Sequence, residues 1–220
     1  MAGAGRQWAL VNSAAWEKNP LTIEEVLSSR MVSSPLTVRD SCLVTDGGGA
    51  IILTSAERAK SLKKAPAYVL GVGDDLSHYS ISNMADLTVT GAVRSGAAAY
   101  SMAGLKSKDI DVLGLYDAFT ITTLLFLEDL GFCPKGEGGR FVAHGGIAPG
   151  GKLAVNTNGG GLSYCHPGMY GVFILIEAVR QLRAEAGARQ VANCETALAH
   201  GNGGTLSAQS TVILGTAATL

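Results

Sequence analysis

From residue 67 onward, short apolar runs alternate with helical patterns, and this alternation constrains the fold more than any other feature. The expected strands are 67–73, 110–116, 153–156, 191–198 and 205–214, and the expected helices are 90–104, 119–130 and 171–187. Strand–helix–strand crossovers are right-handed and place parallel strands together, while two consecutive strands around the turn 200–204 can pair as a hairpin. The order β-α-β-α-β-α-β-β therefore predicts an α/β fold with a mixed five-stranded sheet and helices on both faces.

Composition limits the classes of function that this chain can have. Its 220 residues are 47% hydrophobic, enough to bury the core of one domain or one and a half. A net charge of -1, from 17 basic and 18 acidic residues, provides no basic patch for nucleic acid and no polybasic membrane anchor. The longest apolar run, 172–176, is far below the roughly 20 residues that span a bilayer. Residues 1–12 also lack a signal-peptide core, so we expect a cytoplasmic protein without a membrane span.

The four cysteines predict neither a metal site nor a disulfide framework. They stand at positions 42, 133, 165 and 194 with no CxxC spacing. Cys42 and Cys194 lie in apolar, strand-like runs and are expected to be buried packing residues. Cys165 alone lies in a motif with chemical potential, and the sequence leaves both a packing role and a functional role open.

The N-terminal part and one long loop carry weaker local signals. Thr22 followed by Glu25 predicts a capping box and a short helix. The apolar stretches on either side of the glycines in 41–54 predict a strand broken by a turn or bulge, and a helix is expected after Ser55. The loop 134–152 contains seven glycines and two prolines, so we expect no regular structure there and a functional or contact surface instead.

The segment 156–171 has the pattern of a ligand-binding loop. Three consecutive glycines follow Asn158, and His166 precedes Pro167 where the next helix should begin. Glycines allow the backbone to approach a ligand closely, and helix N-termini present N–H groups to a polarised carbonyl. The helix that follows is apolar all round over 169–176, so it should be buried and needs cover on two sides, by self-association or by a partner chain.

Three motifs in order give the chain a family resemblance. The asparagine–glycine run at 156–161, followed by His166-Pro167, resembles the asparagine-glycine-glycine to histidine-proline motif of the thiolase superfamily. The segment 116–119 (Tyr-Asp-Ala-Phe) resembles the family's Asn-Glu-Ala-Phe segment, and 200–204 occupies the place of its late Cys-x-Gly-x-Gly loop. The resemblance implies a thiolase-like fold in which 1–66 is a remnant of the N-terminal half and 67–220 is the C-terminal domain.

The departures from that pattern indicate a particular branch of the superfamily. No segment resembles the loop of the nucleophilic cysteine, and His200 stands where the acid–base cysteine is found. Tyr116 and Tyr164 resemble the lipid-transfer-protein and sterol-carrier-protein-type branch, which includes aldolases that cleave steroid side chains. The resemblance implies retro-aldol cleavage of a β-hydroxyacyl-CoA without a covalent acyl-enzyme. The alternatives are an acetyl-CoA acyltransferase fragment whose nucleophile comes from a partner, and a non-catalytic lipid or acyl-CoA carrier.

Within this resemblance each candidate residue has an expected role. We expect Tyr116 or Tyr164 to transfer the proton of the β-hydroxyl group, and His166 with His200 to polarise the thioester carbonyl. Tyr116 has the alternative of a core aromatic residue at a strand end. The substrate-binding residues implied by the motifs are Asn158, Gly159, Gly160, Asp117 and Gly203. The ligand is then an acyl-CoA thioester, in which coenzyme A is part of the substrate and no further cofactor is expected.

Overall fold

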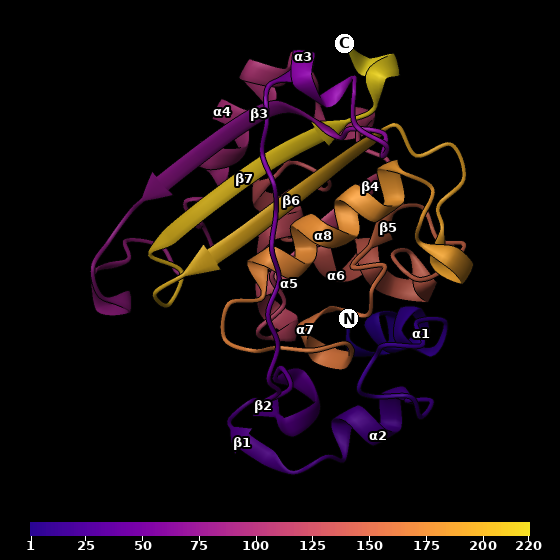
Figure 1. The fold of residues 1–220 in the computed structure, drawn as a ribbon. Helices are drawn as coiled ribbons and strands as arrows, with labels where there is room; N and C mark the ends of the chain where they lie inside the picture. Colours follow the sequence, from indigo (N-terminus) through magenta and orange to yellow (C-terminus); the bar gives the residue numbers. More distant parts are fainter.

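The computed structural model describes residues 1–220 and contains the predicted five-stranded mixed sheet (Figure 1). The strands are β3 Tyr68–Leu76, β4 Val112–Leu115, β5 Ala154–Val155, β6 Thr196–Gly203 and β7 Ala208–Gly215. Their spatial order is β3-β7-β6-β4-β5. β4 runs parallel to β5 and β6, whereas β7 pairs antiparallel with β3 and β6. Because β4 and β5 are parallel, the segments that follow them leave the sheet at the same edge.

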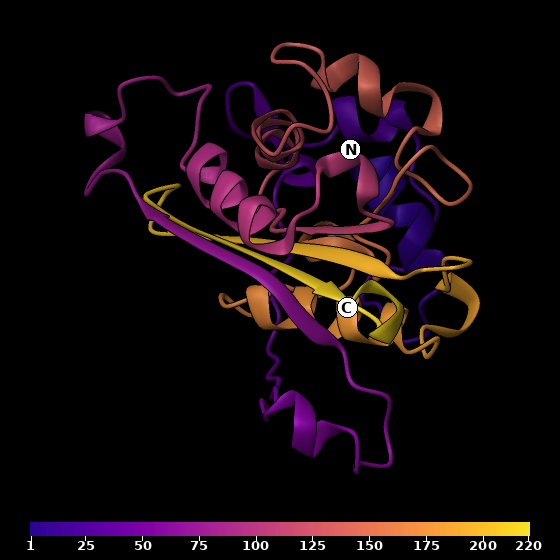
Figure 2. The same ribbon diagram turned by 90° about the horizontal axis from the view of Figure 1, so that it is seen from above.

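Helices cover both faces of the sheet, as expected (Figure 2). One face carries α4 (Ala92–Ala103), which packs on β3 and β7, and α5 (Thr120–Asp129), while α8 (Gly171–Leu182) packs on β4 and β6 on the other face. Gly71 and Gly73 of β3 allow α4 to approach closely, because a Cβ at either position would collide with a carbonyl oxygen of that helix. The core between these layers includes the fully buried Phe126 and Leu198.

The helix signals of the sequence are largely confirmed. Thr22 accepts from the N–H of Glu25 at 3.1 Å and donates its own N–H to the Glu25 carboxylate at 2.8 Å, which forms the capping box of α2. Gly104 ends α4 in the left-handed region with φ 66°. The other helices are α1 Ala2–Leu10, α2 Ile23–Leu27, α3 Ala56–Ala59, α6 Gly138–Val142 and α7 Gly160–Ser163.

Short elements complete the chain. The pair β1 Met31–Ser33 and β2 Leu36–Thr37 forms a separate two-stranded sheet near the N-terminus. The 3-10 helices are Val38–Asp40, Ile81–Asn83, Ser107–Asp109, Ala143–Gly145, Gly187–Arg189 and Ala217–Thr219. None of the helices combines the length and the apolar character needed to cross a bilayer.

The strand expected over 41–54 is wrong. Only Ser41 forms an isolated bridge, with Phe119, and the rest of the segment is extended without a partner strand. It crosses the outer side of α8 on its way to α3 (Figure 1), and a Cβ at Gly49 would lie 2.8 Å from Ile176 Cδ1. The sequence has strand-like composition here, but no neighbouring strand is available to complete the ladder. The segment instead supplies part of the second cover that the apolar helix α8 was expected to need.

Two further expectations about loops need correction. β6 continues to Gly203 and pairs along its whole length with β7, so the turn lies at 204–207 and His200 lies within a strand opposite Thr211. The glycines of 201–204 resemble a turn locally, but the ladder to β7 keeps them extended. The loop 134–152 is not wholly irregular either, because it contains α6 and the 3-10 turn Ala143–Gly145.

Candidate active site

The predicted ligand-binding loop lies at the edge of the sheet where β4 and β5 end. Asn156 has φ 53° and fixes the loop to β4: its N–H donates to Leu113 O at 2.9 Å, and its Oδ1 accepts from Leu115 N–H at 2.7 Å. Tyr116 follows β4 directly. The parallel pairing of β4 with β5 therefore brings the segment that begins at Tyr116 next to the asparagine–glycine loop.

Asp117, Gly159 and Gly160 together shape the backbone of this loop. Gly159 and Gly160 have φ 106° and 71°, and a Cβ at Gly160 would collide with the Asp117 carboxylate. That carboxylate accepts from Gly161 N–H at 2.6 Å and Leu162 N–H at 3.3 Å, so it caps α7. Complete burial raises the pKa of Asp117 to about 7, although these N–H bonds oppose the shift. In this structure Asp117 and the two glycines thus hold the start of α7.

Three aromatic rings surround the centre of the site. The Tyr116 ring meets the His166 ring edge-on at 5.3 Å between centroids, and the Tyr170 ring stacks on His166 at 6.0 Å. The Tyr116 hydroxyl donates to Gly168 O at 3.2 Å. The Tyr170 hydroxyl, which is fully buried, donates to Asn158 Oδ1 at 2.8 Å. His166 is thereby held in a fixed orientation by two phenol rings.

His166 has a polar atom with no partner in the chain. Its Nε2 is buried and has no hydrogen-bond partner. The backbone N–H of His166 donates to Thr45 Oγ1 at 2.9 Å, which ties the loop to the extended segment 41–54. Desolvation lowers the pKa of His166 below its ordinary value, so its imidazole is neutral near pH 7. A buried, unpaired ring nitrogen costs free energy unless a ligand satisfies it.

The phenols and thiols around His166 are also neutral. Burial raises the pKa of both Tyr116 and Tyr164, and Tyr164 packs edge-on against Phe173 at 6.0 Å. Burial also raises the pKa of Cys42, and that of Cys165 to about 11. Neither thiol is therefore a ready thiolate, and neither environment resembles that of an activated nucleophile.

His200 is not brought together with His166. It is fully buried, and its ring lies 4.5 Å from the Phe126 ring between centroids. Its Nδ1 lies 2.8 Å from Thr211 Oγ1 and its Nε2 lies 2.9 Å from Gln209 Oε1. Burial lowers the pKa of His200 to about 4. Gly203 lies further along the same strand, exposed and paired with Ala208, so neither residue faces the loop at 156–166.

Gln209 fixes the tautomer of His200. Its Nε2 donates to Leu206 O at 2.9 Å, which leaves its Oε1 to accept from the histidine. His200 Nε2 therefore carries the proton, and Nδ1 accepts from the Thr211 hydroxyl. Both ring nitrogens are satisfied, and only the main chain of His200 reaches the site, where its carbonyl accepts from Tyr116 N–H at 3.0 Å.

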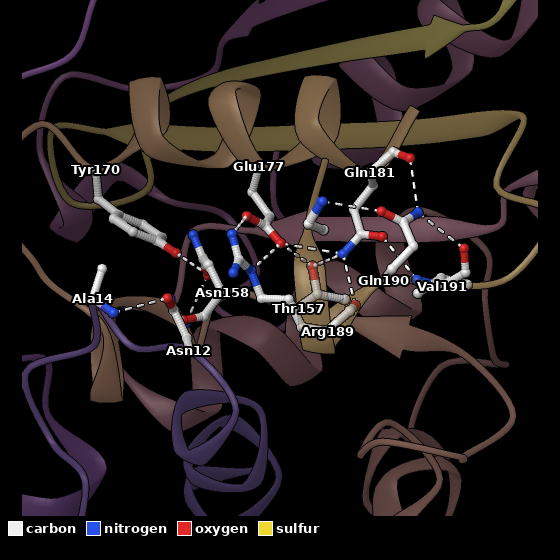
Figure 3. A network of polar contacts seen from close by, with 12 residues as sticks. Asn12, Ala14, Thr157, Asn158, Tyr170, Glu177, Gln181, Arg189, Gln190 and Val191 are labelled. Atoms are coloured by element: carbon white, nitrogen blue, oxygen red, sulfur yellow. Dashed lines mark hydrogen bonds and ion pairs between the residues drawn. The ribbon is translucent and has the colours of Figure 1, made fainter. Parts of the chain in front are cut away.

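A buried polar network supports the loop from the side of α8 (Figure 3). Arg189 donates to both oxygens of Glu177, at 2.9 and 3.0 Å, and Thr157 donates to Glu177 Oε1 at 2.8 Å. Gln181 Nε2 donates to Thr157 Oγ1 at 3.0 Å. Thr157 is thus held between the Arg189–Glu177 ion pair and the Gln181 amide. Its neighbour Asn158 accepts a hydrogen bond from the Tyr170 hydroxyl.

Several contacts that hold the site join residues far apart in the sequence. The sequence patterns assign no role to Tyr170 and predict no helix over α1. Asn12, just after α1, donates to Asn158 O at 2.8 Å, and Arg6 of α1 donates to Ser163 Oγ at 3.0 Å. Both side chains are buried, at 4% and 2% exposure. Buried polar residues remote in sequence could be found only from the tertiary structure.

Comparison with known proteins identifies the family. The family described as "Thiolase C-terminal domain-like" matches residues 73–216. The chain therefore belongs to the thiolase family, as the three motifs predicted.

Individual relatives support the expected branch. "Benzoylsuccinyl-CoA thiolase subunit BbsB" of Thauera aromatica is 38% identical over 210 residues, which cover 94% of this chain and 54% of the relative. "17-hydroxy-3-oxo-4-pregnene-20-carboxyl-CoA lyase" of Mycobacterium tuberculosis is 40% identical over 190 residues, covering 82% and 48%. The solved structure "Ltp2-ChsH2(DUF35) aldolase" matches 98% of this chain and 56% of its own with a TM-score of 0.89 and 33% identity. The chain thus spans about half the length of these relatives.

Proposed function

We propose that this chain is the His166-bearing part of an enzyme that cleaves a carbon–carbon bond of a β-hydroxyacyl-CoA by a retro-aldol reaction. The observation that carries the proposal is the buried, unpartnered Nε2 of His166, set between two phenol rings in a thiolase-type loop. The raised pKa values of Cys42 and Cys165 support a route without a covalent acyl-enzyme. The names of the lyase and the aldolase among the relatives point to the same chemistry.

The reaction needs one proton acceptor and one or more donors. The β-hydroxyl loses its proton, its oxygen forms a carbonyl with Cβ, and the Cα–Cβ bond breaks. The electron pair passes to Cα and is delocalised into the thioester as an enolate, which is then protonated at Cα. Groups that hold the developing charge on the thioester oxygen accelerate this step, because they bind the transition state more strongly than the substrate.

The protonation states support an exchange of the expected roles. Neutral Tyr116 and Tyr164, whose pKa values are raised, are poor bases but can donate a hydrogen bond to the enolate oxygen. His166, whose pKa is lowered, is neutral and can accept the β-hydroxyl proton at Nε2. For Tyr116 to donate to substrate, its hydroxyl must leave Gly168 O, so the loop 167–170 has to move when substrate binds. In this scheme His200 stabilises the sheet and does not touch the substrate.

We further propose that the active form is an assembly. Val44, Ile52 and Leu53 in the extended segment 41–54 are 98%, 90% and 80% exposed, which is unusual for a stable surface. One relative is named as a subunit and the aldolase structure carries two names, so each points to a multi-chain enzyme. A second copy, a partner chain or further residues of a longer polypeptide would cover this surface. We place the assembly in the cytoplasm, with coenzyme A as part of the substrate and no other cofactor.

A turnover assay tests the proposed reaction. The purified chain, alone and mixed with the products of neighbouring genes, is given a β-hydroxyacyl-CoA, and release of a ketone or aldehyde is followed. Turnover that is lost in His166→Gln and retained in His78→Gln, a change at a loop histidine whose contacts are exposed and lie outside the site, is the expected result. Thiolysis of a β-ketoacyl-CoA in place of cleavage would identify the acyltransferase alternative.

The carrier alternative makes a different prediction for the same protein. If no turnover occurs in any mixture but the chain binds acyl-CoA, the carrier function replaces the enzymatic one. The cavity beside Asn156 and Tyr170 has a volume of only about 10 Å³. That cavity holds at most one water molecule, so it admits neither the acyl chain of a carrier nor the substrate of an enzyme, and the turnover and binding assays decide between the two functions.

A further inference from the structure

The glycine-rich loop after α6 encloses a surface cavity that the proposed reaction does not use. Its volume is about 480 Å³, within the usual range for small-molecule sites. Residues of the loop 143–152 form most of the wall, and α1 contributes Gln7. The buried Ile147 anchors the loop, because its carbonyl accepts from Trp8 Nε1 at 3.0 Å. The cavity is therefore supported by a fixed contact with α1.

The charge around this cavity has one sign. Arg140 and Lys152 are the two charged residues that line it, and no acidic residue does. His144 and Lys152 make no ion pair or side-chain hydrogen bond, and Arg140 has only an exposed pair through Nη1 to Glu137 at 3.3 Å. Such exposed pairs contribute little free energy, so the guanidinium is available to another anion. In a chain of net charge -1, this is a local concentration of cationic groups.

The backbone adds further donors. The N–H groups of Gly150 and Lys152 have no hydrogen-bond partner in the chain. His144 and Gly145 have left-handed φ values of 54° and 79°, and Gly146 returns to the right-handed region. The N–H of Gly146 in this turn donates to Ala143 O at 3.2 Å, so the free backbone donors of the cavity are those of Gly150 and Lys152. The half-buried Phe141 gives the cavity an apolar wall on which a planar base can pack.

We propose that this cavity binds a phosphate ester or anhydride, with Arg140 and Lys152 pairing with the phosphate oxygens. Two sources can supply that chemistry: the nucleotide end of coenzyme A, or a free nucleotide or polyphosphate. Guanidinium, ammonium and backbone N–H groups are the usual partners of phosphate. The proposal concerns equilibrium binding at a second site, so it can hold or fail independently of retro-aldol turnover.

Calorimetric titration tests the site with four probes: sodium pyrophosphate, adenosine 3′,5′-bisphosphate, coenzyme A and phosphate-free pantetheine. We expect one-to-one binding of at least one phosphate probe and none of pantetheine at the same site. Arg140→Gln and Lys152→Gln should each weaken that binding about tenfold or more. Lys108→Gln, which removes the same charge from an exposed position outside the cavity, should change it less than twofold. Affinity should fall as ionic strength rises.

The pattern across probes distinguishes the two sources. Tighter binding of the bisphosphate and coenzyme A than of pyrophosphate assigns the site to the nucleotide end of coenzyme A. Equal or tighter binding of pyrophosphate assigns it to a free polyphosphate, and both patterns support the site. The absence of saturable binding by every phosphate probe, or an equal loss in Lys108→Gln, would overturn it. Arg140 and Lys152 are exposed, so unchanged thermal unfolding of their variants excludes misfolding as the cause.

Discussion

His166 and His200 occupy the two thiolase motif positions of this chain that bear a histidine, and the structure treats them in opposite ways. His200 is fully buried in β6 with both ring nitrogens paired, and its pKa is lowered to about 4. His166 is half-buried in a loop, with Nε2 free and a pKa that desolvation also lowers. Both imidazoles are neutral at pH 7, but only His166 has a ring nitrogen without a hydrogen-bond partner.

This difference shows that a residue at a motif position need not have the chemical role that the motif implies. The late motif of thiolases carries an acid–base group. In this chain, His200 is hydrogen-bonded to Thr211, and Thr211 is hydrogen-bonded to Ser95 of α4. A fully satisfied buried polar network stabilises one arrangement of a core, and it loses that value if a member must move toward a ligand. The proposed chemistry is therefore concentrated at His166 and the phenols beside it.

The largest effect is expected for His166→Gln, which removes the free ring nitrogen. Loss of a positioned general base lowers rates by about 10²–10⁴-fold, so kcat should fall by that factor with little change in unfolding free energy. Steady-state kinetics on β-hydroxyacyl-CoA measure the change, and urea unfolding checks the fold. A variant that retains more than a tenth of the wild-type kcat would remove His166 from the mechanism.

The reverse pattern is expected for His200→Ala. The substitution leaves a cavity beside Phe126 and removes the partners of Gln209 and Thr211, so the free energy of unfolding should fall by about 2–4 kcal/mol. Urea denaturation measures the loss, with His144→Ala as the exposed control, which should change stability by less than about 0.5 kcal/mol. Folded protein should keep kcat within about threefold, and a selective loss of kcat without destabilisation would contradict this account.

The pH dependence of stability gives a third comparison, between His200 and Asp117. The folded pKa of His200 lies at about 4, below its ordinary 6.5, so its contribution is present above pH 6.5 and is lost as pH falls toward 4. The folded pKa of Asp117 is raised from 3.8 to about 7, so its contribution is present below pH 3.8 and is lost as pH rises through 7. Each group changes the slope of unfolding free energy against pH by at most about 1.4 kcal/mol per pH unit.

Single substitutions should separate these two slopes. Between pH 4 and 6.5, the unfolding free energy of His200→Gln, taken relative to wild type, should fall as pH rises. That of Asp117→Asn, also taken relative to wild type, should rise. Chemical denaturation at a series of pH values measures both slopes. Two variants whose slopes deviate from wild type in the same direction would show that one of the pKa assignments is wrong.

The smallest effect is expected in the network that supports the loop. Thr157→Val keeps the shape but removes the donor to Glu177 and the acceptor for Gln181, which should cost about 1–2 kcal/mol of stability. Because Asn158 orients Tyr170 against His166, kcat should fall by less than about tenfold with KM unchanged. Thr157→Ser restores the hydroxyl and should restore both values. Failure of the serine variant to do so would mean that the methyl group, and not the hydrogen bonds, holds the loop.

Local sequence signals identified most of the scaffold and part of the site. The alternation of apolar runs and helical patterns predicts the sheet and its three covering helices, because each element buries one face. The asparagine–glycine motif and Tyr116 each follow a predicted strand, and they lie together because parallel β4 and β5 end at the same edge. The capping box at Thr22 involves only four consecutive residues, so sequence alone reveals it.

The other parts of the fold and of the site depend on contacts between residues that are far apart in the sequence. The glycines after His200 resemble a turn, and only their ladder with β7 shows that the strand continues and that His200 is enclosed. The segment 41–54 has strand composition without a neighbouring strand. The Tyr170 ring is held in position because Asn158 accepts a hydrogen bond from its hydroxyl. No local sequence pattern specifies that partner.

Nitrogen-15 NMR of protein labelled at histidine compares the two rings in a single experiment. The chain, in the assembly that shows turnover, is titrated with acetyl-CoA, the simplest thioester product of the proposed cleavage. This account predicts that the Nε2 resonance of His166 shifts in a saturable manner, as a free nitrogen gains a partner, while both His200 resonances stay in place. A saturable shift at His200 with none at His166 would contradict the assignment of the chemistry to His166.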